Sequence, residues 1–328
     1  MKKALILGVT GQDGSYLADL LIEKGYIVYG MVRRSATGNT RNIQHLLDDE
    51  TVVNKQFFVV RGDLADVTSL FRIIDEVEPD EIYNEADQDH ISWSFDIVGY
   101  SADITGAAVG RLLEVIRQIN PAIRFFQPCT SHMFGRSETM TQNEETPFNP
   151  QSVYALSKIS AYYFTRYYRE TFQMHASTAI FYNHESPRRT SEYVTRKITQ
   201  SVARIAHGKQ DRLVLGDLSA HIDWGYAREY MEAAWNILQQ LESDDYVIAT
   251  GEAHSIEEFV NESFKCADLD PAKYVESSSE LFRPTATSTL VGDTQKARER
   301  FGFSPKIHFK ELVKLMVEAD LKMESGDL

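Results

Sequence analysis

KALILGVTGQDGSYLADLLIEKGY, residues 3–26, places a short apolar run, a glycine-rich turn and a helical pattern in direct succession. The apolar run is typical of a strand buried on both faces, and the apolar positions after the turn recur at helical spacing. Gly8, Gly11 and Gly14 lie between these two segments. Glycines there permit a tight turn and let backbone N–H groups approach a pyrophosphate at the start of the helix. The stretch therefore predicts a dinucleotide-binding turn, with an ordinary structural turn as the alternative.

The rest of the first half repeats this alternation of apolar runs and helical patterns. Strands are expected at 27–33, 56–64, 81–86 and 124–131, and helices at 69–79 and 105–119. Strict alternation implies right-handed crossovers and a doubly wound parallel sheet. The predicted fold class is therefore α/β, with a Rossmann-type sheet over residues 1–181.

After residue 181 the pattern changes. Residues 182–210 begin with an arginine-rich loop and continue as a helix, and residues 251–328 hold further helices and loops. We expect these two segments to form a smaller, discontinuous C-terminal substrate-binding lobe, with about 211–250 returning to the Rossmann domain. A cleft between the two lobes is the expected ligand site.

Composition restricts the classes of partner. The 328 residues include 34 Lys and Arg against 48 Asp and Glu, a formal net charge of −14. Such an acidic surface argues against general binding of nucleic acid or anionic membrane. Cys129 and Cys266 are far apart and lack the spacing of a metal site, so we expect no metal and a reducing cytoplasm. No apolar run approaches ~20 residues, so no membrane-spanning segment is expected.

The end of the second predicted strand indicates which dinucleotide would bind. An NAD site places an acidic residue there for the ribose hydroxyls, but this chain has Arg33 and Arg34, followed by Ser35. Two arginines suit a 2′-phosphate through charge-assisted hydrogen bonds, so NADP is favoured over NAD. The alternative is a solvated basic surface turn. Asp63 and Leu64, at the end of the third strand, are expected beside the adenine.

Tyr154 and Lys158 lie four residues apart, on one face of a predicted helix. A phenol at its reference pKa of ~10 is a poor base near neutral pH. A neighbouring ammonium and an oxidised nicotinamide both favour phenolate, so the pair would remove a proton from a sugar hydroxyl as hydride leaves. Thr130, at the end of the preceding strand, would help to hold the reacting oxygen. Core packing is the alternative for the other tyrosines of this helix.

With these motifs the chain resembles the extended short-chain dehydrogenases/reductases, and more narrowly the GDP-mannose 4,6-dehydratase family. The resemblance covers nearly the whole chain and is carried by stretches such as GVTGQDGSYLADLLIEKGY, TPFNPQSVYALSK, and NHESPRR followed by VTRKIT. It implies bound NADP, a GDP-linked sugar in the interlobe cleft, and a homodimer or homotetramer in which the Tyr154–Lys158 helix forms part of the dimer contact.

Together with the motifs above, the resemblance implies three sets of site residues. The catalytic residues would be Thr130, His132, Tyr154 and Lys158. The cofactor would be bound by Gly8, Thr10, Gly11, Gln12, Asp13, Gly14, Arg33, Arg34, Asp63, Leu64, Tyr154, Lys158 and His184. The nucleotide sugar would be bound by Asp89, Ser131, Asn183, Arg188, Val194, Lys197 and Arg283.

The chain departs from the family around the expected sugar. In the family a tyrosine and a lysine oxidise C4 to a ketone, and a glutamate after Thr-Ser takes the C5 proton and protonates the departing C6 hydroxyl. Here His132 follows Ser131, and an imidazole, with its reference pKa of ~6.5, is also able to accept and donate a proton. An acidic stretch, EADQDH at 85–90, replaces small residues. Ile222 and Ala286 replace a basic and an acidic residue.

The favoured function is an NADP-dependent GDP-sugar 4,6-dehydratase that acts through a 4-keto intermediate. One alternative is a 4-epimerase or 4-keto reductase with the same Tyr154 and Lys158, because His132 replaces the usual glutamate. A more remote alternative is a catalytically silent NADP-binding protein.

Overall fold

A parallel sheet of seven strands forms the centre of the protein. The computed structural model describes residues 1–35, 38–278 and 289–326. The strands lie in the order β11–β7–β5–β4–β1–β2–β3, and every neighbouring pair is parallel. They are β1 (Lys3–Leu7), β2 (Ile27–Val32), β3 (Phe57–Arg61), β4 (Glu81–Asn84), β5 (Arg124–Thr130), β7 (Ala176–Phe181) and β11 (Asp245–Ile248). Because the strand order reverses between β1 and β4, the predicted doubly wound α/β fold is confirmed.

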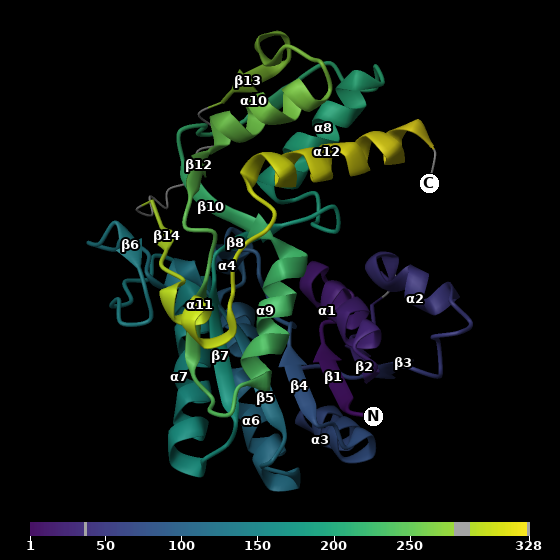
Figure 1. Ribbon diagram of the computed structural model, residues 1–328, viewed down its shortest axis with the longest axis vertical. Helices are drawn as coiled ribbons and strands as arrows, with labels where there is room; N and C mark the ends of the chain where they lie inside the picture. The colour runs from purple at the N-terminus through teal and green to yellow at the C-terminus, as the bar shows by residue number, and fades with distance from the viewer. Residues whose placement is uncertain (36–37, 279–288, 327–328) are drawn as a thin grey trace.

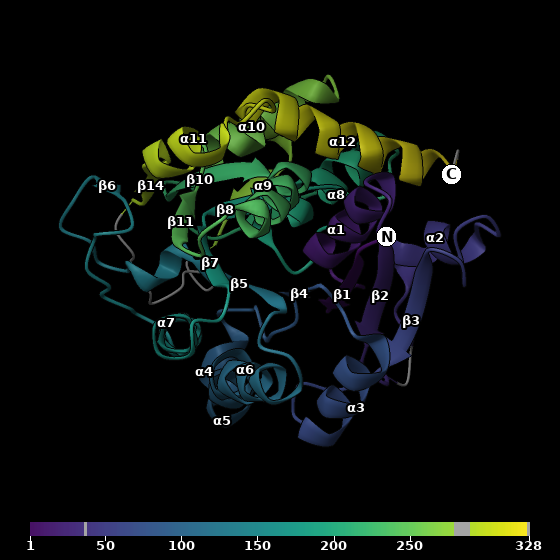
Figure 2. The same ribbon diagram turned by 60° about the horizontal axis from the view of Figure 1, so that its bottom comes forward.

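Helices cover both faces of this sheet, as Figure 2 shows. One face carries α1 (Gln12–Glu23) and α9 (Ala227–Gln239). The opposite face carries α3 (Val67–Val77), α6 (Ala108–Ile119) and α7 (Val153–Phe172). The buried apolar side chains of α1 and α9 share one core cluster with strand residues, and those of α3 and α6 share another. Two such cores fix the carboxyl ends of the strands as one rigid edge, where the site described below is built.

A smaller lobe lies beyond that edge (Figure 1). It contains α8 (Val194–Ala206), α10 (Ile256–Cys266) and α12 (Phe309–Ser325), and a sheet of β8 (Asn183–Glu185), β10 (His221–Tyr226) and β12 (Ala253–Ser255). Its own apolar core includes Trp224, Phe259, Phe264 and Phe309. Because β8 follows β7 after a single residue, the lobe is tied directly to the edge of the large sheet.

The division of the chain between the two lobes is finer than we expected. Within 211–250, β9 (Leu213–Leu215) pairs with β13 (Val275–Ser277) and buries its leucines in the small lobe. Of the elements within 211–250, β11 belongs to the large sheet and α9 packs on one face of it. Conversely, α11 (Gln295–Phe301) packs against the Rossmann side, where Phe301 contacts Tyr246 of β11. Apolar burial, rather than position in the sequence, decides to which lobe each short segment belongs.

Short elements complete the described chain. They are α2 (Gln44–Asp48), α4 (Trp93–Asp96), α5 (Val98–Ser101), a π-helix (Ala102–Ala107), 3₁₀ turns at Arg41–Ile43, Ser131–Met133 and Pro271–Lys273, and the strands β6 (Thr141–Gln142) and β14 (Val291–Gly292). No helix in the described ranges combines the length and apolar character needed to cross a membrane.

Candidate active site

The glycine-rich turn is packed too tightly for side chains. Gly8 has φ +79°, and a Cβ atom there would lie 2.6 Å from the carbonyl oxygen of Glu85. A Cβ atom on Gly14 would lie 2.5 Å from the carbonyl oxygen of Gly8. The turn leads directly into α1, whose first N–H groups have no partners within the helix. This close-packed turn and helix start fit the pyrophosphate of a dinucleotide.

Arginine side chains lie at the same edge, where β2 ends. Arg33 and Arg34 are exposed, and Arg33 Nη1 donates a hydrogen bond of 2.8 Å to the Tyr100 hydroxyl. Asp63 and Leu64 follow the adjacent strand β3. Since β1, β2 and β3 are neighbours in a parallel sheet, their carboxyl ends meet in one place. The residues predicted for the adenosine part of the cofactor are thus grouped at one edge of the sheet.

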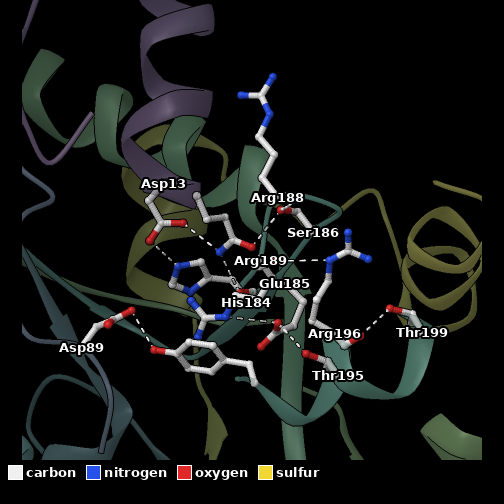
Figure 3. Close-up of polar contacts among 12 residues, drawn as sticks. Asp13, Asp89, His184, Glu185, Ser186, Arg188, Arg189, Thr195, Arg196 and Thr199 are labelled. Carbon is white, nitrogen blue, oxygen red and sulfur yellow. Dashed lines mark hydrogen bonds and ion pairs between the residues drawn. The ribbon is translucent and has the colours of Figure 1, made fainter. Parts of the chain in front are cut away.

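An ion pair joins the glycine-rich turn to the small lobe (Figure 3). Asp13, in the first turn of α1, lies 2.8 Å from Nε2 of His184 on β8. Nδ1 of His184 lies 2.8 Å from the carbonyl oxygen of Tyr182. The Gln12 amide donates to the His184 carbonyl and accepts from the Ser186 hydroxyl. Thr10 precedes α1 in this turn, and its carbonyl accepts from Asn42.

A cavity at the carboxyl ends of β1, β4 and β5 brings all four predicted catalytic residues together. Thr130 ends β5, His132 lies in the following 3₁₀ turn, and Tyr154 and Lys158 lie in the first half of α7. The lining also includes Gly11, Gln12, Asp13, Glu85, Asp87, Asp89, Asn183, His184, Arg189 and Tyr193. The cavity is therefore continuous with the cofactor turn and reaches the small lobe.

The start of α7 positions Tyr154 beside Thr130. The Ser152 side chain caps the helix by accepting from the N–H of Ala155. The Tyr154 N–H donates to Ser94 Oγ, and the Tyr154 hydroxyl shares a hydrogen bond with the Thr130 side chain. The Lys158 ammonium lies 5.8 Å from the centre of the Tyr154 ring. Phenol, hydroxyl and ammonium thus lie together in the cavity.

Lys158 has a partner that the sequence did not suggest. Its ammonium lies 2.7 Å from a carboxylate oxygen of Asp87 and donates a 2.8 Å hydrogen bond to the Pro128 carbonyl. Burial lowers the pKa of Lys158, but Asp87, Tyr154 and Cys129 together raise it more, so the net pKa is raised. Asp87 itself has a raised pKa because burial outweighs the attraction of Lys158.

The balance at Tyr154 corrects our expectation of a phenol made acidic by its lysine. Burial is the largest influence and raises the pKa of Tyr154; Lys158 and the hydrogen bond from Thr130 lower it, while Asp87 and Asp89 raise it. The net pKa is raised. The ammonium acts in the expected direction, but the protein alone keeps the phenol protonated.

His132 is a neutral imidazole at neutral pH. Its side chain is partly buried, and burial lowers its pKa to about 4. Its backbone N–H donates to Thr130 Oγ1 at 3.3 Å, which ties the 3₁₀ turn to the end of β5. A neutral imidazole in the cavity is ready to accept a proton.

Arg189, rather than Arg188, faces the cavity. The Arg188 guanidinium lies over the Tyr16 ring and forms an ion pair of 2.7 Å with Asp19, pointing away from His184 in Figure 3. Arg189 lies 3.4 Å from the centre of the Tyr193 ring, and its Nε is 3.4 Å from Glu185. Burial lowers the pKa of Arg189, but Glu185 and the other acidic neighbours raise it more.

The remaining predicted substrate residues are spread around this centre. Asp89 accepts a 2.7 Å hydrogen bond from the Tyr193 hydroxyl, and Asn183 lines the cavity. Ser131 is buried next to Thr130. Val194 and Lys197 lie on α8, where the Lys197 ammonium donates to the Val214 carbonyl at 2.7 Å. Val194 and Lys197 are not among the residues that line the cavity. Arg283 and Ala286 lie outside the described residues.

The cavity-lining residues that were missing from the predicted site include four polar ones: Glu85, Asp87, Arg189 and Tyr193. The acidic stretch 85–90 was a signal for the first two, although only Asp89 was chosen from it. Nothing in the sequence separates Arg189 from Arg188. Tyr193 precedes α8 and gave no signal of its own.

Comparison with known proteins identifies the family. The sequence model described as "GDP-mannose 4,6 dehydratase" matches residues 5–316. GDP-mannose 4,6 dehydratase 1 of Arabidopsis thaliana is 46% identical over 327 residues, which cover 98% of this chain and 90% of that protein. The chain belongs to the GDP-mannose 4,6-dehydratase family. This confirms the resemblance drawn from the motifs, and the human GDP-mannose 4,6 dehydratase is 42% identical over 98% of this chain and 91% of its own length.

Solved structures of more distant proteins share the fold of this GDP-mannose 4,6-dehydratase family member. A dTDP-glucose 4,6-dehydratase from Bacillus anthracis in complex with NAD has a TM-score of 0.85 at 21% identity, covering 99% of this chain and 98% of the other. RMD from Pseudomonas aeruginosa complexed with NADPH has a TM-score of 0.80 at 17% identity, covering 98% and 100%. At these identities the likeness is one of fold.

Proposed function

We propose that this protein is an NADP-dependent 4,6-dehydratase of a GDP-linked sugar, acting through a 4-keto intermediate. The observation that carries the proposal is the single cavity in which Thr130, Tyr154 and Lys158 meet His132, in a chain of this family. The relatives are named dehydratases, which favours dehydration over the 4-epimerase and 4-keto reductase alternatives.

The residues divide the proton transfers between them. With the added positive charge of an oxidised nicotinamide, which favours phenolate, Tyr154 takes the proton of the C4 hydroxyl, and Thr130 donates a hydrogen bond to the C4 oxygen. Bound NADP would supply the acceptor for the hydride from C4 and the donor for its return at C6. Once C4 is a ketone, the C5 hydrogen is acidic, and the neutral imidazole of His132 takes it as a proton and passes it to the C6 hydroxyl, which departs as water. When hydride adds back at C6, C5 receives the proton that Tyr154 took from the C4 hydroxyl. His132 thus carries the role of the family's glutamate.

Three finer assignments belong to the same proposal. NADP rather than NAD is supported by Arg33 and Arg34 at the end of β2, which suit a 2′-phosphate. A GDP-linked substrate is supported by the family and by Asn183 in the cavity. A cytoplasmic location remains a prediction from cysteine usage.

We also propose a homo-oligomer, with α7 at its interface. Leu156, Tyr163 and Tyr167 of this helix are 57%, 55% and 52% exposed, and Phe164 is 37% exposed. The first three are spaced seven and four residues apart, so they form a stripe on one side of the helix. Large apolar side chains gathered on one helix face mark a protein–protein contact rather than a solvated surface.

Product mass tests the reaction. The protein is incubated with GDP-mannose and NADP, and the nucleotide sugar is analysed by mass spectrometry. Loss of one water supports dehydration, and unchanged mass with a new stereoisomer would indicate epimerisation. A 4-keto reductase would leave GDP-mannose unchanged, and in a parallel incubation of a GDP-linked 4-keto sugar with NADPH it would give a gain of two hydrogens with consumption of NADPH. Tyr154→Phe should abolish turnover while leaving cofactor binding intact; unchanged activity in this variant would remove Tyr154 from the mechanism.

A further inference from the structure

The Lys158 ammonium is held by two groups of the protein itself. Asp87 lies 2.7 Å from it on one side, and the Pro128 carbonyl accepts from it at 2.8 Å. The side chains of Lys158 and Asp87 are 4% and 15% exposed. With so little water around the pair, its electrostatic attraction is stronger than that of a surface ion pair.

Tyr154 needs the same positive charge. A phenol loses its proton more readily when a cation lies beside it, and less readily when an anion does. Lys158 is the cation beside Tyr154, and Asp87 is an anion that acts on both residues. The other titratable or charged groups that line the cavity are Asp13, Glu85, Asp89, Cys129, His132, Tyr182, His184, Arg189 and Tyr193. Of the groups that line this cavity, only Asp87 forms an ion pair with the ammonium.

We propose that Asp87 is a positioning residue, which holds Lys158 in place and offsets part of the lysine charge that Tyr154 would otherwise experience. The proposal rests on the proposed function, because it assigns Tyr154 and Lys158 the proton transfer. Asp87 is predicted to touch neither the sugar nor the proton in flight; it acts through Lys158.

This role predicts a change in pH dependence, which a purely structural role of Asp87 would not produce. Asp87 raises the pKa of Lys158 by favouring the ammonium, and raises the pKa of Tyr154 by opposing the phenolate. Removing its charge should therefore move the deprotonation of both groups to lower pH. Both limbs of the pH dependence of kcat/KM should move in that direction. A residue that only supports the fold would lower the rate without moving either limb.

The first experiment compares pH profiles. Asp87→Asn keeps the shape of the side chain and removes its charge, and Asp87→Glu restores a carboxylate. Asp244→Asn is the matched control, because Asp244 pairs with Lys296 at 2.7 Å, away from the cavity lining. We expect Asp87→Asn to move both limbs to lower pH by about one pH unit or more, while the Asp87→Glu and Asp244→Asn profiles stay near that of the wild type. Unmoved limbs in Asp87→Asn would overturn the proposal.

The second experiment needs no turnover. A short pulse of an acetylating reagent at fixed alkaline pH labels neutral amines, and mass spectrometry reports the label on Lys158. In Asp87→Asn we expect labelling of Lys158 to rise about tenfold or more, the factor that one pKa unit represents, with no rise in Asp244→Asn. Asp87→Ala should give the same rise and serves if the asparagine variant folds poorly.

The two experiments separate the two proposals. Unchanged labelling of Lys158 in both Asp87 variants overturns the role of Asp87, whatever the protein does to GDP-mannose. Increased labelling in a protein that never converts GDP-mannose leaves the role of Asp87 in place and overturns the proposed substrate.

Discussion

The imidazole Nε2 of His184 lies 2.8 Å from the carboxylate of Asp13. The other ring nitrogen faces a carbonyl oxygen, that of Tyr182, at the same distance. Because both partners are hydrogen-bond acceptors, the ring fits best with a proton on each nitrogen, as a cation. Burial lowers the pKa of His184, but Asp13 and the Tyr182 carbonyl raise it more, and the net pKa is raised. Burial raises the pKa of Asp13, yet His184, Arg189 and Gln12 together bring the net value below the ordinary one.

We expect Asp13→Asn to reduce the free energy of unfolding by about 1.5–3 kcal/mol, the range of a charged hydrogen bond. The loss has a defined pH dependence. Since the folded pKa of His184 is raised, its part of the stability is full below about pH 6.5, the unfolded value, and disappears as pH rises through the folded pKa. The part from Asp13 is lost at acid pH, as pH falls through its lowered folded pKa.

Urea unfolding of the wild type and Asp13→Asn, repeated from acid to alkaline pH, measures this difference. His184→Gln and the double variant complete a double-mutant cycle, in which we expect a coupling of about 0.5–3 kcal/mol near pH 6. A difference between wild type and Asp13→Asn that stays constant with pH would show that the pair is not an ion pair in solution.

From the sequence, the backbone of this site could be predicted better than the contacts of its charged side chains. Strand–helix alternation and glycine positions predict the backbone well, because steric limits allow only a few backbone arrangements. The tight turn at Gly8 and Gly14 is present as predicted. Thr130, Tyr154 and Lys158 were found because each lies at a fixed place on β5 or α7. The pairing of Asp87 with Lys158 could not be predicted, because it depends on the path of the irregular segment between β4 and α4. The same holds for Arg189, whose direction is set by the loop before α8.

His132 should be needed for elimination but not for oxidation at C4. Glutamine cannot take the C5 proton, so we expect His132→Gln to slow formation of the dehydrated sugar by about 10²–10⁴-fold. Reduction of NADP in a single turnover, read by absorbance, should remain. Because burial lowers the pKa of His132 to about 4, its protonation should not reduce the rate until the pH approaches that value.

His132→Glu is the control for this prediction, since it restores the residue type of the family. We expect it to keep a substantial rate of dehydration. If His132→Gln dehydrates GDP-mannose as fast as the wild type, another group supplies the base, and the assignment to His132 is lost.

Arg33 and Arg34 should discriminate between the two dinucleotides. Replacing both with alanine removes charged hydrogen bonds to a 2′-phosphate, each worth about 1.5–3 kcal/mol. We expect the Kd for NADP to rise by at least about tenfold and the Kd for NAD to change little, as measured by calorimetry. Arg212→Ala is the control, because Arg212 is an exposed arginine of the small lobe, paired with Glu276. An equal loss for both dinucleotides would contradict a 2′-phosphate site at the end of β2.

The exposed face of α7 provides a test of assembly. Leu156 is 57% exposed, and an arginine there would place a charge in the centre of the apolar contact that we propose between two copies of the chain. Burying an unpaired charge at an interface costs several kcal/mol, so Leu156→Arg should move the protein towards monomers. Light scattering after size-exclusion chromatography measures the mass.

Leu241 supplies the control, because it is 94% exposed and lies between α9 and β11, away from α7. Leu241→Arg should leave the mass unchanged. Since Leu156 lies between Tyr154 and Lys158 on the same helix, loss of the partner should also loosen the segment that carries the catalytic pair, and kcat should fall at protein concentrations where Leu156→Arg is monomeric. A wild-type protein that is already monomeric at working concentration would contradict the contact, and the apolar stripe would then need a different partner.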